Sequence, residues 1–83
     1  MRGMMMLPDA SARLREAVRY AFADVAVMHR GSVRQRILDV AEAELLCLAL
    51  RLNDGNRIHA AKMLGISRNT LAKRVRSLGV GDG

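Results

Sequence analysis

Residues 56–80 read "NRIHAAKMLGISRNTLAKRVRSLGV", and this stretch contains two helix-start signals and a tight glycine turn within 25 residues. Asn56 and Ser67 are residue types that accept hydrogen bonds from the exposed amides of a helix N-terminus. They predict a short helix over 57–64 and a second helix over 68–78. A glycine follows each predicted helix, which is typical of helix ends.

The second of these helices is predicted to have two different faces. Its apolar residues Leu71, Val75 and Leu78 fall within about 60° on a helical wheel. The opposite side is mostly polar and cationic, and it comprises Arg68, Asn69, Ala72, Lys73 and Arg76. A short helix, a glycine turn and an amphipathic second helix indicate a helix-turn-helix. Such a motif places its second helix in the major groove of DNA, where Arg pairs with guanine and Asn with adenine.

Positive charge is concentrated in the same part of the chain. The full sequence of 83 residues has 14 Lys or Arg and eight acidic residues, which gives a net charge of +6. Residues 56–83 hold six of the basic residues and one acid, so +5 of that charge lies there. This asymmetry favours a polyanionic partner, and the alternative is a basic face that only keeps the protein soluble.

Two longer helices are predicted before this motif. Apolar residues recur at helical spacing at Leu14, Val18, Phe22 and Val25. They predict an amphipathic helix from about Asp9 to Met28. Ser32 stands three residues before Gln35, which is the spacing of a capping box, and it opens a helix over 33–52. The sequence therefore predicts an all-α protein of four helices.

The second half of the helix over 33–52 is apolar around most of its circumference, in the run "LLCLALRL". One neighbouring helix covers only one stripe of such a surface. A chain of 83 residues also buries only about 60–65% of its unfolded surface, so a second copy is the natural cover. The sequence predicts an intertwined homodimer with Leu45, Leu48 and Leu52 at its interface. The alternative is a helix at the centre of a monomeric four-helix bundle.

We expect one domain over residues 1–83, with dimerisation helices in 9–54 and the helix-turn-helix in 56–80. No internal repeat, low-complexity tract or interdomain linker is evident in the sequence. The apolar run at residues 4–7 is too short for a secretory signal, and no other segment approaches a membrane span. The single Cys47 fits a reducing compartment. These features predict a cytoplasmic protein without membrane contact, located at the nucleoid if DNA is its partner.

Catalytic and metal-binding patterns are not apparent in the sequence. His29 and His59 have no partner at metal-ligand spacing, and one cysteine does not make a zinc site. Cys47 on an apolar helix is expected to be a small buried hydrophobe rather than a nucleophile. No acid–base pair, activated nucleophile or phosphate-binding loop is present. We therefore expect no enzyme activity, no metal, no cofactor and no small-molecule ligand.

The stretch "GNRIHAAKMLGISRNTLAKRVRSLGV", which begins at Gly55, resembles the C-terminal helix-turn-helix of the Fis family. The DNA-binding tails of NtrC-type enhancer-binding activators share this motif. The likeness covers "GN", "AA" before "LGI", "RNTL", the basic residues after it and the closing "LGV". More loosely, "LREAVRYAF" and the helix through "VAEAELLCLAL" resemble the two helices of the Fis dimer core, so the resemblance extends from about Leu14 to Val80. It implies a homodimer whose recognition helices are too close together for straight B-DNA, so that the duplex bends.

The resemblance also implies which residues contact DNA. Asn56 would meet the DNA backbone at the start of the third helix, with Arg57 and His59 as candidates beside it. Arg68 would read guanine, and Ser67 would cap the fourth helix and approach a phosphate. The remaining contacts would be flanking ones from Asn69 and Thr70 and backbone ones from Lys73, Arg74 and Arg76.

Two departures from the Fis pattern change these expectations. The family commonly has Arg directly after "TL", where this chain has Ala72, so one direct contact is missing and base selectivity is expected to be weaker or different. Fis also carries a longer N-terminal arm that contacts DNA invertases, whereas about eight residues precede the first predicted helix here. We therefore do not expect recombination enhancement.

Three functions are compatible with the sequence. The first is a free-standing homodimer that binds and bends double-stranded DNA in transcription regulation or nucleoid organisation, and it is favoured because the chain contains both a dimer core and a DNA-reading motif. The second is the C-terminal DNA-binding and dimerisation domain of an NtrC-type transcriptional activator. The third is a helical protein-interaction module without DNA binding.

Overall fold

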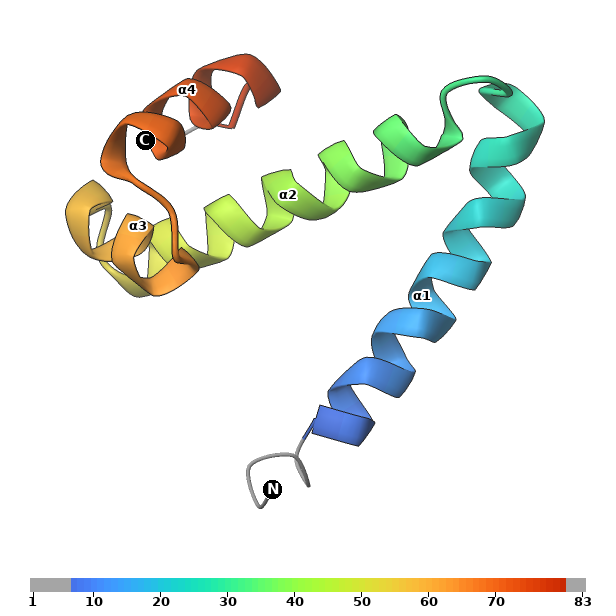
Figure 1. The fold of residues 1–83 in the computed structure, drawn as a ribbon, viewed down its shortest axis with the longest axis horizontal. Coiled ribbons are helices and arrows are strands. Elements are labelled where there is room, and N and C mark those ends of the chain that lie inside the picture. Colours follow the sequence, from blue (N-terminus) through green and yellow to red (C-terminus); the bar gives the residue numbers. More distant parts are fainter. Residues whose placement is uncertain (1–6, 81–83) are drawn as a thin grey trace. The chain divides into compact units, whose positions relative to one another are not determined.

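The computed structural model describes residues 7–80, and these form four α-helices (Figure 1). The helices are α1 (Leu7–Met28), α2 (Val33–Leu52), α3 (Arg57–Leu64) and α4 (Arg68–Leu78). The all-α class and the four predicted helices are confirmed, and no strand occurs within residues 7–80. The chain divides into two compact units, residues 1–37 and 38–83, with the boundary inside α2.

The first helix begins earlier than the sequence predicted, at Leu7 instead of about Asp9. Pro8 therefore lies in its first turn. Proline is tolerated there because the amide N–H that it lacks would have no partner within the helix. Residues 1–6, which hold most of the methionine-rich run, lie outside the described part of the chain.

The apolar stripe of α1 is largely exposed. Leu14, Val18 and Phe22 all retain large exposed areas, and no side chain described in α1 is buried. Gly31 follows the helix with a φ of 96°. The Ser32 amide donates a hydrogen bond to the carbonyl oxygen of His29 at 3.0 Å. Within residues 10–37, the first unit comprises the amphipathic α1, a glycine turn and the first residues of α2, and none of these residues is buried.

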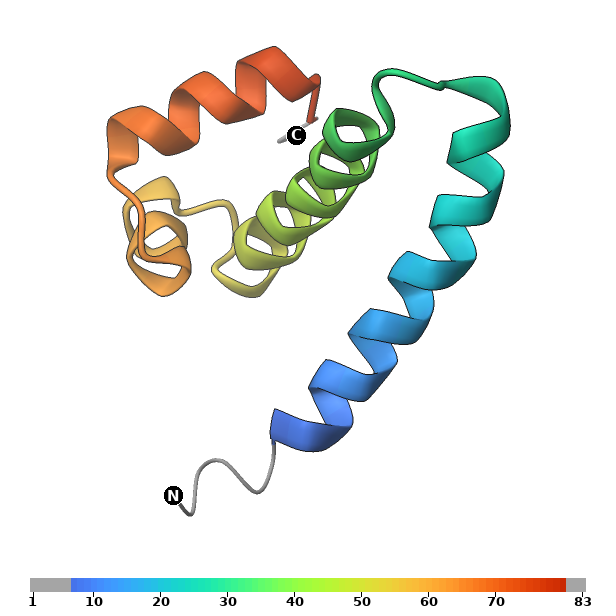
Figure 2. The ribbon, with the colours of Figure 1, turned by 45° about the vertical axis from the view of Figure 1, so that its right-hand side comes forward.

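The buried core lies in the second unit, where α2, α3 and α4 contribute to it. It consists of Leu46, Ala49, Leu50, Ala60, Ala61, Leu71 and Val75. Leu46 of α2 and Leu71 of α4 are its largest fully buried side chains, at 1% and 0% exposure. The two alanines of α3 are small, which allows that helix to pack closely. In both views α3 lies beside the C-terminal end of α2, and α4 extends from there back toward the N-terminal half of α2 (Figure 1, Figure 2).

Side-chain caps and a glycine turn set the bounds of α3 and α4. The side chain of Asn56 accepts a hydrogen bond from the amide of His59 at 3.0 Å, and that of Ser67 accepts one from the amide of Thr70 at 3.0 Å. Gly65 ends α3 with a φ of 79°, in the left-handed region that favours glycine. The caps predicted for both helices are confirmed, so local hydrogen bonds define the helix-turn-helix.

We expect Leu71→Ala to lower the free energy of unfolding by about 2–5 kcal/mol, because it empties space in a small core. Urea denaturation followed by far-UV circular dichroism measures this loss. Ile58→Ala is the matched control, since Ile58 is 50% exposed, and it should cost much less. Equal losses for the two variants would contradict the core described above.

Candidate nucleic-acid interface

The outer face of α4 is exposed and cationic. Because α4 buries Leu71 and Val75, its opposite side lies toward solvent. Asn69, Lys73 and Arg76 fall within about 60° on that side, and all three are exposed. These three residues form the polar surface that we call the outer face of α4.

Arg68 and Ala72 lie at the margins of this outer face. Arg68 is the first residue of α4, and it is exposed although on the helical wheel it lies nearer to the buried side than to the outer face. Ala72 is half-buried. It helps to line a shallow hollow that also includes Arg57 of α3 and Arg76 of α4. Arginines from two helices therefore lie beside the position where the Fis pattern commonly has another arginine.

The N-terminus of α4 favours an anion. No acidic residue occupies the first turn of α3 or of α4, so the partial positive charge of each helix end is not neutralised. The Ser67 hydroxyl donates to the Thr70 hydroxyl oxygen at 2.9 Å and accepts from the Thr70 amide at 3.0 Å. The Ser67 proton is therefore already used, and the Thr70 hydroxyl keeps a proton to donate to an anion.

The start of α3 presents a second set of polar side chains. Asn56 and His59 are exposed, and Arg57 is half-buried. The side-chain oxygen of Asn56 is used in the helix cap, so its amide NH₂ group is left as a donor. These groups and the N-terminus of α4 are two further places where phosphate oxygens could bind.

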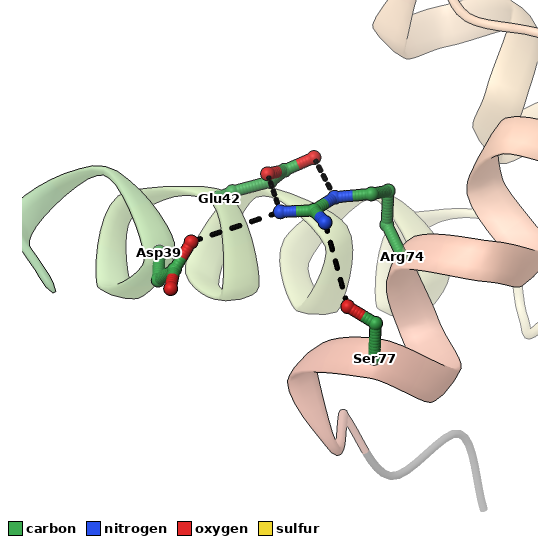
Figure 3. Close-up of polar contacts among 4 residues, drawn as sticks. All are labelled: Asp39, Glu42, Arg74 and Ser77. Atoms are coloured by element: carbon green, nitrogen blue, oxygen red, sulfur yellow. Dashed lines mark hydrogen bonds and ion pairs between the residues drawn. The ribbon is translucent and has the colours of Figure 1, made fainter. Parts of the chain in front are cut away.

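Arg74 points toward α2 instead of the outer face (Figure 3). Its Nη2 and Nε atoms donate to the two carboxylate oxygens of Glu42, at 2.7 and 3.1 Å. Nη2 also lies 3.7 Å from Oδ1 of Asp39, and Nη1 donates to the Ser77 hydroxyl oxygen at 3.4 Å. The hydrogen bonds between Arg74 and Glu42 lower the pKa of the carboxyl and raise the pKa of the guanidinium. We call these four residues the Arg74 cluster.

Sequence reasoning did not identify Asp39 and Glu42 as part of this site. A partial signal exists, because these two acids and the buried Leu46 repeat at steps of three and four residues and therefore share one face of α2. Their basic partner lies 32 residues after Glu42. Such a pairing depends on how α4 packs on α2 and is not visible in local spacing.

A second apolar face of α2 is exposed. Leu45, Leu48 and Leu52, the predicted interface residues, are 55%, 47% and 69% exposed. With Leu38 and Ala41 they repeat at alternating steps of three and four residues, which is the spacing of paired helices. We call these five residues the α2 seam. The helix thus has two apolar faces, and the core of one chain covers one of them.

Neither a cluster of metal-ligand side chains nor a membrane-spanning helix is found among the described residues. Among the side chains that the structure describes, in residues 10–80, no group of three or more His, Cys, Asp or Glu is placed to hold a metal ion. Cys47 is a free, half-buried thiol. No helix within residues 7–80 has the length and apolar character needed to cross a membrane.

The second half of the chain matches a known protein family. The model of a family described as bacterial regulatory protein, Fis family, matches residues 37–78. The DNA-binding transcriptional regulator NtrC of Rhizobium meliloti (strain 1021) is 49% identical over 45 residues, which are 54% of this chain and 9% of that protein. The regulator of the same name from Azospirillum brasilense is 40% identical over 53 residues, which are 64% of this chain and 11% of that protein.

A shorter relative matches across most of its own length. The DNA-binding protein Fis of Psychromonas ingrahamii (strain DSM 17664 / CCUG 51855 / 37) is 35% identical over 72 residues, which are 82% of this chain and 73% of that protein. This chain therefore spans about a tenth of the NtrC proteins and about three quarters of the Fis protein. No solved structure matches the chain significantly.

Glu42→Gln should make folding stability less sensitive to acid. The pKa of Glu42 is lowered from its ordinary value of 4.5, so its contribution to stability is present above about pH 4.5 and is lost as pH falls through the lowered pKa. The wild-type urea midpoint should therefore fall more between about pH 6 and about pH 3 than that of the variant. Glu44→Gln, which removes an exposed acid from the same helix, is the control. A Glu42→Gln profile as steep as that of the wild type would contradict the ion pair.

Proposed function

Because this chain belongs to the Fis family of bacterial regulatory proteins, we propose that it binds and bends double-stranded DNA as a homodimer. It acts in transcription regulation or nucleoid organisation, in the cytoplasm where that DNA lies. The observation that carries the proposal is the exposed cationic outer face of α4, on a helix whose first turn holds no acid. The net charge of +5 over residues 56–83 supports it, since cationic side chains attract the phosphate backbone.

We assign base recognition and contact with the DNA backbone to different residues. Arg68 at the start of α4 reads guanine, and Asn69 and Thr70 make flanking contacts with the DNA. Lys73 and Arg76 on the outer face hold phosphates, and these contacts fix the register of the protein without reading sequence. Further backbone contacts come from the start of α3, through Asn56, Arg57 and His59.

Two of the predicted DNA contacts receive a modified role. Ser67 caps α4 and orients the hydroxyl of Thr70, so the phosphate contact at this point is made by Thr70. The guanidinium of Arg74 already binds Glu42, and we therefore assign it no phosphate. With alanine at position 72, affinity depends more on phosphate contacts and less on base contacts.

Two copies of the chain pair through the α2 seam. The seam is apolar, exposed in the single chain and spaced like the contact residues of paired helices. The exposed stripe of α1 is the second apolar surface that a partner covers. Two-fold symmetry then presents two outer faces, one for each half-site. If they lie closer together than one turn of straight DNA, the duplex bends at a cost of roughly 1–6 kcal/mol.

A second candidate function is that of the C-terminal DNA-binding domain of an NtrC-type activator. Its support is the identity of 49% with NtrC of Rhizobium meliloti over 45 residues, against 35% with Fis of Psychromonas ingrahamii over 72 residues. An ATPase domain upstream in the same reading frame would establish this candidate. Both candidates bind DNA through the same motif.

A helical protein-interaction module is the candidate from another class, and a salt series separates it from both DNA-binding candidates. Binding to random duplex DNA is measured at several salt concentrations. Each neutralised phosphate should contribute about −0.9 to the slope of log affinity against log salt concentration. A flat slope would remove the DNA-binding proposal and favour the interaction module.

Arg68→Ala and Arg76→Ala should have different effects on binding. Arg68→Ala is expected to cost roughly 1–3 kcal/mol at specific sites and to reduce the ratio of specific to non-specific affinity. Arg76→Ala is expected to weaken all duplexes about equally and to reduce the salt slope by roughly one. Titrations of specific and random duplexes over a salt series measure both effects. If Arg76→Ala changed the site preference and Arg68→Ala did not, the assigned orientation of α4 on DNA would be wrong.

Leu48→Glu should abolish the dimer, because it buries an unpaired carboxylate twice in the α2 seam, at a cost of several kcal/mol each. Monomers lose the second half-site and its high effective concentration, so affinity and bending should both fall. Sedimentation velocity measures the mass, and circular-permutation mobility shifts measure the bend.

Val40→Glu is the control for the dimer prediction. Val40 is 70% exposed on α2 and lies outside both the α2 seam and the core. This variant should stay dimeric and should bend DNA. A monomeric wild-type protein that binds straight DNA at full affinity would refute the homodimer and the bend.

A further inference from the structure

The Arg74 cluster connects the helix that carries the α2 seam to the helix that carries the outer face. We propose that Glu42 and Asp39 act through Arg74 to set the orientation of α4 relative to α2, and thereby the half-site spacing that the dimer accepts. This inference rests on the proposed function, namely duplex binding by a homodimer. In it, Arg74 is a positioning residue and makes no phosphate contact.

The contact between Arg74 and Glu42 is directional. Two nitrogens of one planar guanidinium bind both oxygens of one carboxylate, at 2.7 and 3.1 Å (Figure 3). This paired geometry restrains the plane and the direction of both side chains, which a single-point contact does not. Asp39 and Ser77 approach the same guanidinium at 3.7 and 3.4 Å. Groups from two helices therefore restrain one side chain.

The apolar contact between α2 and α4 restrains the angle between the two helices less than the ion pair does. The buried residues of these two helices, which are Leu46, Ala49, Leu50, Leu71 and Val75, belong to one core together with those of α3. Burial of apolar surface is non-directional, so it stabilises the contact over a range of helix angles. The ion pair adjoins this core, because Glu42 lies about one turn before Leu46 and Arg74 directly precedes Val75. It is therefore placed to select one angle from that range.

Symmetry makes the dimer sensitive to this angle. In the proposed dimer, the α2 seam packs against the partner protomer, and the outer face of α4 contacts the DNA. Any rotation of α4 against α2 in one protomer is repeated in its partner, so the separation of the two outer faces changes. That separation sets the half-site spacing. Loosening the Arg74 cluster should therefore widen the range of accepted spacings instead of weakening every duplex equally.

The local charges oppose a phosphate contact by Arg74. Asp39 and Glu42 supply two carboxylates around one guanidinium. Moving Arg74 to a phosphate would leave both carboxylates without this partner beside a polyanion, which is electrostatically unfavourable. The two roles predict different results for Glu42→Gln. Release of a phosphate-binding Arg74 would tighten binding to all duplexes, whereas loss of a positioning contact would reduce the spacing preference.

The test uses the full chain and duplexes that the wild-type protein selects from a random pool. The central spacer of these duplexes is then lengthened or shortened by one base pair. Arg74→Met removes the guanidinium and keeps an unbranched side chain, and Glu42→Gln keeps the shape of Glu42 without its charge. The controls are Arg76→Met and Glu44→Gln, each at an exposed position on the same helix as its counterpart. Kd values over a salt series give the spacing preference and the salt slope.

Arg74→Met and Glu42→Gln should each reduce the affinity ratio between the best spacer and the altered spacers by roughly two- to fivefold, the range for a partly exposed ion pair. Their salt slopes should stay close to that of the wild type. The double variant should resemble either single variant, since both remove the same interaction. Arg76→Met should lower the salt slope by about 0.9 and leave the spacing ratio unchanged.

Two binding results would overturn the positioning role. In the first, Glu42→Gln tightens binding to every spacer relative to Glu44→Gln, and Arg74→Met lowers the salt slope as Arg76→Met does. Arg74 would then be a phosphate contact. In the second, Arg74→Met and Glu42→Gln both keep the wild-type spacing ratio.

A measurement without DNA separates this inference from the proposed function. Residual dipolar couplings of backbone amides in the free protein report the orientation of α4 relative to residues 38–52 of α2. We expect Arg74→Met and Glu42→Gln to alter these couplings and both controls to retain them. Glu42→Gln alone decides the question if Arg74→Met does not fold. Unchanged couplings in both variants would overturn the positioning role, even if the wild type binds DNA. A wild type that binds no duplex would overturn the proposed function, and the couplings would still decide the role of Arg74.

Discussion

The helix α2 carries apolar side chains on two faces, and a single chain buries only one of them. Leu46, Ala49 and Leu50 pack in the core with α3 and α4, whereas the α2 seam is exposed. A chain of this length has too little apolar surface to enclose such a helix completely, because shorter chains bury a smaller fraction of their surface on folding. One face of α2 therefore orders the helix-turn-helix, and the other is left for a second copy in the proposed dimer.

The helix-turn-helix depends on that core because its own helices are short. The helices α3 and α4 have 8 and 11 residues, and isolated helices of fewer than about 12–15 residues are marginal in water. Their caps and glycine turns define where each helix begins and ends, but packing against α2 keeps them folded. The unit with this core, residues 38–83, nearly coincides with the residues 37–78 that match the Fis family model. The family match therefore covers the part of the chain whose buried side chains form one core.

The basic residues of α4 have two different electrostatic environments. Lys73 and Arg76 are exposed on the outer face, so their charge attracts anions and is screened by salt. The charge of Arg74 is balanced by Glu42 and Asp39, and the pair contributes direction to the contact between α2 and α4. Under the two proposals, neighbouring positions of α4 have different roles: Lys73 and Arg76 hold DNA, and Arg74 positions the helix.

The sequence by itself determined the local features of this protein. Asn56 and Ser67 as caps predicted where α3 and α4 begin, because a cap needs only an amide three residues away. The start of α1 was missed by two residues, since proline is compatible with a first helical turn and does not mark its beginning. Only the tertiary structure decided which face of α2 is buried and which arginine of α4 is paired. The family resemblance implied backbone contacts for both Arg74 and Arg76, and the difference arises because packing brings Glu42, 32 residues away from Arg74, to one of them and not to the other.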